Sequence, residues 1–288
     1  MVAFAASNKI SEIMVMKFCV HLNMQISPPK HLAPFIRHYI FLENHKKDIK
    51  NVRLFTDGST GLILSANMSL YSDLSEERIP TSFFYGALNS YKDFSSKGKF
   101  SFIAVVFQPY FLNMLLKISA KEIKDQIISV EEVLKDKLIP FQEKLFYKIN
   151  LLTIIDDLNI FFTRFISKEM GNDYQLIAAI QQYILQHRGA VSSKDLERFT
   201  GYSERQLERK FENYMGASPK KYTNIIRLHY FLSLMNKGIS SENMTVLSYY
   251  AGYSDQSHLI REFKKNVGLT PLQYVKTENK MAVNFIEL

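Results

Sequence analysis

The sequence predicts an α+β protein in which a β-rich N-terminal domain precedes an all-α domain made of two helix-turn-helix units in tandem. Between about residues 35 and 107, short runs of β-branched and aromatic residues are bounded by turn residues, which is typical of strands. From about residue 139, apolar residues recur every three or four positions, the period of amphipathic helices. A spaced motif that starts at Gly201 recurs at Gly252, and this repeat predicts the tandem.

The second copy of the motif predicts a tight turn that leads into a short helix. Gly252 lacks a Cβ atom and can adopt a positive φ without steric cost. Ser254 is suited to cap the helix, because its hydroxyl can accept from an unpaired amide of the first turn. Leu259, Phe263 and Val267 recur at intervals of four and would form the buried side. Small polar and basic residues are left on the free side, as in a helix that reads DNA.

The first copy matches the second at an offset of 51 and then, after one extra residue, at an offset of 52. Two copies are too few for a solenoid, which needs about three or more repeats. We therefore predict two similar helix-turn-helix units; the alternative is a plain all-α domain with repetitive helix caps. The matched residues of the first copy are Gly201, Tyr202, Ser203, Leu207, Arg209, Phe211, Gly216, Ser218, Pro219 and Tyr222.

The second copy resembles the signature of the AraC/XylS transcription regulators in residues 252–258 (GYSDQSH), 263–264 (FK) and 268–271 (GLTP). The resemblance covers roughly residues 174–278. Two positions depart from it, because Glu197 and Ser248 stand where the family usually has a small alanine four residues before the turn glycine. Ser248 is a mild change, whereas Glu197 must point outward or have its carboxylate satisfied.

The resemblance implies a bacterial, cytoplasmic and nucleoid-associated protein that binds double-stranded DNA sequence-specifically and regulates transcription. Activation is the more common outcome in the family, which implies RNA polymerase as a partner. The stretch from about residue 25 is similar, much more weakly, to the cupin-like sensor half of many AraC-type regulators. The alternative is a repressor or architectural DNA-binding protein that responds to no small molecule.

Charge and cysteine content are compatible with this function. The formal net charge is +8, and residues 174–288 hold 15 Lys/Arg against 10 Asp/Glu, so basic charge is denser there. Cys19 is the only cysteine, which excludes a disulfide within one chain and favours a reducing cytoplasm.

No apolar run approaches the roughly 18 residues of a membrane span. Residues 1–19 are expected to form a poorly ordered tail or an added strand, not a signal peptide.

These patterns divide the chain into five segments. We expect a tail or added strand over residues 1–24, a β-rich sensor or dimerisation domain with C-terminal helices over 25–168, and a linker over 169–173. The DNA-binding domain follows over 174–278, and a tail over 279–288. Within the β-rich domain, Asp57 and Gly58 signal a hairpin or else a longer loop. The helices within 139–166 would either join two copies into a homodimer or simply cover the sheet.

The DNA-binding domain is expected to contain seven helices, the longest of which joins the two units. That helix begins at Pro219 and has about 18 residues, so it spans roughly 27 Å at 1.5 Å per residue. Successive major-groove faces on one side of B-DNA lie about 34 Å apart. One chain could therefore place both recognition helices, one from each unit, in neighbouring major grooves.

The expected DNA contacts lie on the outward side of the recognition helices and at their starts. Arginine can donate two hydrogen bonds to guanine, glutamine can pair with adenine, and free amides at helix starts can bind phosphates. The resemblance and this geometry select Ser203, Arg205, Glu208, Arg209, Ser254, Gln256, Ser257, Arg261, Lys264 and Lys265. The acidic Glu208 would accept from a cytosine amine or orient Arg205. His258 would buttress the turn or contact a phosphate, and no third ligand stands near it for a metal.

Catalytic signatures are absent from the sequence. It has no Gly-x-Ser-x-Gly, no phosphate-binding loop, no His-Glu-x-x-His, no Cys-x-x-Cys and no cupin-type His-x-His pair. We therefore expect no enzyme, no metal and no cofactor. If a small-molecule effector binds, aromatic strand residues would line its pocket, unless they are ordinary sheet core. The candidates are Phe83, Phe84, Tyr85, Phe102 and Phe107.

Overall fold

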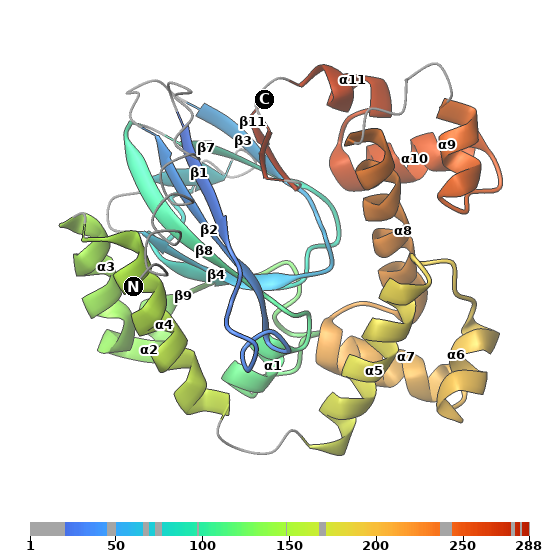
Figure 1. The fold of residues 1–288 in the computed structure, drawn as a ribbon, viewed down its shortest axis with the longest axis horizontal. Coiled ribbons are helices and arrows are strands. Elements are labelled where there is room, and N and C mark those ends of the chain that lie inside the picture. The colour runs from blue at the N-terminus through green and yellow to red at the C-terminus, as the bar shows by residue number, and fades with distance from the viewer. Residues whose placement is uncertain are drawn as a thin grey trace, which may run out of the picture.

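A computed structural model of the chain describes residues 21–44, 50–65, 69–72, 77–96, 98–147, 149–166, 171–236, 244–277, 280–282 and 284–287. Figure 1 shows a strand-rich N-terminal domain beside a helical C-terminal domain. The predicted α+β class and the order of the two domains are confirmed.

The strands of the N-terminal domain form two antiparallel sheets. The first sheet has the order β1 (His21–Ile26), β2 (Ile36–Asn44), β8 (Phe100–Phe107), β4 (Thr60–Ser65), β6 (Phe83–Tyr85) and β9 (Ile127–Ser129). The second has the order β10 (Lys280–Ala282), β11 (Phe285–Glu287), β3 (Lys50–Leu54), β7 (Lys92–Ser96) and β5 (Leu70–Ser72). Of the predicted N-terminal tail or added strand, residues 21–24 belong to β1 and pair with β2. Cys19 lies outside the described residues.

The first sheet is buried on both faces. Side chains of a strand point alternately to its two faces, and on β8 the residues Ile103, Val105 and Phe107 pack against the helices of this domain. The even-numbered residues from Phe100 to Val106 pack toward the second sheet. The covering helices are α1 (Phe111–Leu116), α2 (Val130–Leu134), a 3-10 turn (Lys135–Leu138), α3 (Ile139–Phe146) and α4 (Leu151–Ile166). The stretch 139–166 thus forms two helices, and both lie against the sheet in Figure 1.

Seven helices make up the C-terminal domain in the described residues, as predicted. They are α5 (Asn172–Gln186), α6 (Ser193–Thr200), α7 (Glu204–Met215), α8 (Pro219–Asn236), α9 (Met244–Tyr250), α10 (Gln256–Val267) and α11 (Pro271–Lys276). One apolar cluster lies under each helix-turn-helix unit, and α8 contributes to both. No helix in the described part of the chain has the length and apolar character needed to cross a membrane.

The hairpin expected at Asp57 and Gly58 is wrong, and the longer-loop alternative holds. The two flanking strands, β3 and β4, lie in different sheets, so the segment crosses between layers. Gly58 has φ +75°, and a Cβ there would lie 2.7 Å from the ring of Tyr222 on α8. The loop therefore needs glycine because it packs tightly against the C-terminal domain.

The tail expected over residues 279–288 is also wrong. Residues 280–282 and 285–287 are strands, and β11 pairs antiparallel with β3 of the N-terminal domain. Ile286 is fully buried in the apolar cluster of the second helix-turn-helix unit. The chain thus returns from the DNA-binding domain to complete the second sheet, beside the C-terminus marked in Figure 1.

Buried side chains join the two domains directly. Phe55, just after β3, is fully buried among the helices of the second unit, with its ring centroid 6.2 Å from that of Tyr274. Arg53 pairs with Asp93 at 2.5 Å and donates to the carbonyl oxygen of Val267, at the end of α10, at 3.4 Å. The second unit is therefore fixed against the second sheet.

Candidate nucleic-acid interface

The first recognition helix, α7, begins with a well-capped turn. Gly201 has φ +75°, and Ser203 is the N-cap, whose N–H donates to Oε1 of Gln206 at 3.0 Å. The N–H of Glu204 donates to Oε1 of Glu197 at 2.8 Å. The carboxylate of Glu197, one of the two departures from the family pattern, is thus satisfied, because it accepts from an amide of the first turn of α7 that has no partner within the helix.

One side of α7 is buried and the other is free. Leu207 and Phe211 are at most 1% exposed and face α5 and α8 in the cluster of the first unit. Arg205, Glu208 and Arg209 are all exposed. The periodicity of the sequence therefore placed Arg205 and Arg209 on the surface correctly, and Glu208, which the family resemblance supplied, is exposed as well.

The second recognition helix, α10, begins one residue later than predicted. Asp255 is its N-cap, and its carboxylate accepts from the N–H of His258 at 2.7 Å. That hydrogen bond, with further help from Ser254, lowers the pKa of the Asp255 carboxyl. The prediction of Ser254 as the cap is wrong. Its hydroxyl instead donates to the Asp255 carboxylate at 3.1 Å.

The outward side of α10 carries the remaining candidates. Ser257, Arg261, Lys264 and Lys265 are exposed, while the side-chain Oε1 atom of Gln256 accepts from the hydroxyl of Thr245 at 3.2 Å. The buried side is formed by residues that correspond to those of α7, with Leu259 in place of Leu207 and Phe263 in place of Phe211. Arg261 consequently occupies on α10 the position that Arg209 occupies on α7.

His258 is half-buried at the start of α10. Its ring meets the ring of Tyr253 edge-on at 5.6 Å between centroids, and Tyr253 is only 4% exposed. This contact favours the predicted buttressing role. No group of three or more potential metal ligands occurs among the described residues.

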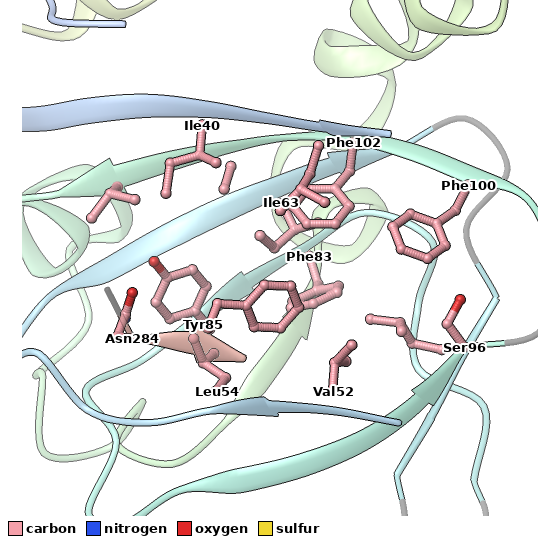
Figure 2. A pocket seen from close by; sticks show the side chains of 15 residues that line it. Ile40, Val52, Leu54, Ile63, Phe83, Tyr85, Ser96, Phe100, Phe102 and Asn284 are labelled. Carbon is pink, nitrogen blue, oxygen red and sulfur yellow. The ribbon is translucent and has the colours of Figure 1, made fainter. Parts of the chain in front are cut away.

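The aromatic candidates for an effector pocket separate into two sets. Phe83, Tyr85 and Phe102 line a cavity of about 70 Å³ between the two sheets, shown in Figure 2. Phe84 and Phe107 lie in the other apolar cluster, against the covering helices. Their assignment to the pocket is wrong, because successive strand residues point to opposite faces and both faces of this sheet are buried.

Two features of the cavity were missed from the sequence. Asn284 and Phe285, from the C-terminal strand, form part of its wall. Ser96 also lines it, and in the described part of the chain its buried hydroxyl has no hydrogen-bond partner. Neither feature has a local signal, since each depends on pairing between distant strands.

Two protein families match separate parts of the chain. Residues 196–277 match the family described as a helix-turn-helix domain. Residues 24–129 match a family described as a domain of unknown function (DUF6597).

Among curated proteins, the chain is similar to the uncharacterized HTH-type transcriptional regulator YdeC of Bacillus subtilis. The two are 22% identical over 157 residues, which are 54% of this chain and 53% of that protein. The chain therefore spans about half the length of this relative.

The solved structures that are similar to the chain include the following two. ToxT from Vibrio cholerae, bound to (E)-4-(8-methylnaphthalen-1-yl)but-3-enoic acid, is 14% identical, with 82% of this chain and 98% of that chain covered and a TM-score of 0.47. A probable AraC family transcriptional regulator from Rhodopseudomonas palustris is 21% identical, with 35% and 95% covered and a TM-score of 0.33.

The repeated turn, the capped recognition helices and the shared helix α8 all fall within the matched region. Residues 196–277 thus form a helix-turn-helix domain, and the signature in residues 252–271 resembles that of the AraC/XylS regulators.

Proposed function

We propose that the chain binds double-stranded DNA sequence-specifically and regulates transcription, with α7 and α10 in neighbouring major grooves. The observation that carries this proposal is the equivalence of Arg209 and Arg261. Each is exposed at the same position of a capped helix, and neither forms an ion pair within the described residues. Arginine in such a position donates two hydrogen bonds to the O6 and N7 atoms of guanine.

The length of α8 supports simultaneous binding by both helices. Its 18 residues span roughly 27 Å, against about 34 Å between successive major-groove faces. A modest bend of the duplex toward the protein shortens that separation, at an elastic cost that depends on sequence.

The other candidates divide by chemistry into base contacts and phosphate contacts. Arg205, Glu208 and Gln256 are suited to base edges, because their planar groups match donors and acceptors in the major groove. Lys264 and Lys265 in the last turn of α10 are suited to phosphates. Ser203 and Ser257 at the helix starts, together with Ser254, would help to hold the backbone.

Selection from a random-sequence duplex library, using the full chain, tests this proposal. We expect enrichment of two short motifs about one helical turn apart. Arg78 is exposed at the edge strand β5 of the second sheet, so Arg78→Ala is a control that keeps the selected motifs. Failure to enrich any sequence would contradict sequence-specific binding, even if the chain still bound DNA at low salt.

By its resemblance to its family, the chain would act as an activator that recruits RNA polymerase to a promoter. Transcription with purified RNA polymerase, from a promoter that carries the selected site, measures this directly. An increase in transcript supports activation. A decrease would make the chain a repressor.

The cavity between the sheets supports a second function, the sensing of a small molecule. Its walls are almost wholly apolar, with Ser96 as the buried hydroxyl that lacks a partner. A buried hydroxyl without a hydrogen bond costs free energy that a ligand can recover. A small apolar molecule with one hydrogen-bonding group fits this lining.

Because the cavity is small, binding of such a ligand would change the contact between the N-terminal domain and the DNA-binding domain. At about 70 Å³ it is roughly half the volume of an engineered 150 Å³ cavity that binds benzene, so a ring-sized ligand enters only if a wall moves. We propose that the wall that moves is β11, a three-residue strand whose Phe285 lines the cavity. Its movement would withdraw Ile286 from the second helix-turn-helix unit.

Thermal shift with phenol and with benzene tests the sensing function. A ligand that binds only the folded state raises the melting temperature, and phenol should raise it more than benzene does. Ser96→Ala should remove the difference between the two. Equal or absent shifts in the unsubstituted chain would contradict an aromatic ligand anchored at Ser96.

A further inference from the structure

One loop of the N-terminal domain is fixed against the first recognition helix. This loop, residues 119–126, follows α1 and precedes β9. The N–H of Ala120 donates to the carbonyl oxygen of Asn213, near the end of α7, at 2.8 Å. A Cβ at Gly216 would lie 2.8 Å from the carbonyl oxygen of Ala120. Ile123, which is 3% exposed, anchors the loop in the core of its own domain.

Lys121 extends from this loop beside the residues expected to read DNA. It is exposed and lines one open groove together with Arg205, Glu208 and Arg209 of α7. Within the described residues Lys121 forms no ion pair. Its ammonium group is therefore available to an anion that enters the groove.

A second lysine of the loop, Lys124, joins a group of positive charges where α8 begins and α10 ends. Lys221, at the start of α8, donates to the carbonyl oxygen of Asn89 at 3.2 Å. Burial lowers the pKa of Lys221 to about 8, and the charges of Lys124 and Lys265 act in the same direction, with Asp125 opposing them. Lys221 and Lys265 line one groove, and the charges of Lys124 and Lys265 both act on the ammonium group of Lys221.

Such a group of like charges favours a dense anion, because each neutralised pair removes repulsion. Double-stranded DNA carries one negative charge per roughly 1.7 Å of its axis. A duplex that spans both recognition helices would pass the end of α7, the start of α8 and the end of α10. Loop 119–126 contacts the end of α7, and its neighbour Asn89 contacts the start of α8. Asn89 also lines one groove with Lys265, at the end of α10.

We infer that loop 119–126 of the N-terminal domain is part of the DNA-binding surface, where Lys121 and Lys124 bind phosphates of the duplex that α7 and α10 read. This inference rests on the proposed DNA binding and extends it to the other domain. Phosphate contacts fix position and carry no sequence information. The N-terminal domain therefore adds affinity without changing the selected sequence, and only while it is docked against α7.

The test is the salt dependence of DNA affinity, measured with the full chain and the duplex selected above. The variants are Lys121→Ala, Lys124→Ala and the double variant. Lys137→Ala is the matched control, because Lys137 is exposed in the 3-10 turn between α2 and α3. These two helices lie away from both recognition helices in Figure 1. Melting temperatures establish that each variant is folded.

The slope of log K against log salt concentration should become less negative by about 0.9 for each lost phosphate contact. The double variant should therefore change the slope by about 1.8 and keep the same selected motifs, while the control keeps the original slope. Unchanged slopes in the folded loop variants would overturn the inference. Tighter binding would also overturn it, since the loop would then obstruct DNA. If the unsubstituted chain bound no duplex, the proposed DNA binding itself would fail.

Discussion

The N–H of Phe55 donates to the carbonyl oxygen of Asn284 at 2.9 Å, although 229 positions separate the two residues. Phe55 precedes the DNA-binding domain in the chain, and Asn284 follows it. Around this bond, β3 pairs with β11, and both Phe55 and Ile286 are fully buried against α8–α11. The second helix-turn-helix unit thus packs against one chain segment that precedes it and one that follows it, and the two segments pair with each other.

Ile286→Ala should lower the free energy of unfolding by about 2–4 kcal/mol, because it removes a fully buried side chain and leaves a cavity. Urea denaturation followed by circular dichroism measures this change. Val275→Ala is the control, since Val275 is 47% exposed and its truncation should cost little. Equal losses for the two variants would show that the C-terminal strand does not support the domain.

Stability should fall as the pH drops below about 6.5, because two half-buried histidines are held neutral. Burial lowers the pKa of His38 and of His229 more than the neighbouring Asp57 carboxylate raises it. Below pH 6.5 the unfolded chain takes up protons that the folded chain does not, so the free energy of unfolding falls. The slope is at most about 1.4 kcal/mol per pH unit for each histidine.

Denaturation at pH 7.5 and at pH 5.5 measures this effect. His229→Gln should reduce the loss between the two values, and His187→Gln should not, because His187 is exposed at the end of α5. An unfolding free energy that stays constant between these pH values would contradict the account.

Asp255→Ala should destabilise the second unit more than Ser254→Ala, because Asp255 caps the first turn of α10. Melting temperatures of the two variants, side by side, measure the difference. A larger fall in melting temperature for Ser254→Ala would show that Ser254, as the sequence predicted, is the N-cap.

Homodimer formation through α4 is a further prediction. Leu152 and Ile160 are 59% and 55% exposed on this helix, although its opposite side packs on the sheet. Exposed apolar side chains spaced along one helix favour pairing with a second copy. Sedimentation equilibrium should give a dimer for the unsubstituted chain, and Leu152→Glu with Ile160→Glu should give a monomer.

The control for this pairing is Thr153→Glu on the same helix, which places one glutamate at an exposed polar position and is compared with Leu152→Glu alone. A monomer at every concentration of the unsubstituted chain would contradict dimerisation. In that case α3 and α4 only cover the sheet.

The seven helices of the C-terminal domain could be predicted because their signals are local. The spacing of Leu207 and Phe211, and of Leu259 and Phe263, sets the buried side of each recognition helix, so the exposed positions follow from geometry. The exact first residue of a helix is harder to predict where two residues suited to the N-cap are adjacent. Ser254 and Asp255 both suit an N-cap, and only the path of the chain decides between them.

The elements that could not be predicted depend on contacts between distant segments. The strand at Phe285 is three residues long, and its partner β3 lies more than 200 positions earlier. The alternation of Phe83 and Phe84 was visible, but both faces of the sheet are buried, so polarity gave no sign of which face lines the cavity. The loop at Gly58 crosses between sheets and packs against Tyr222 of the other domain, a contact between distant segments.

The central claim is that two equivalent arginines read two separate segments of one DNA site. The most direct test measures the affinity of the unsubstituted chain, Arg209→Ala and Arg261→Ala for the selected duplex and for duplexes with single guanine replacements. Each variant should lose about 1–3 kcal/mol of discrimination in one segment only, the two segments lying about one helical turn apart. If both variants lost discrimination in the same segment, or in neither, the two helices would not read neighbouring major grooves.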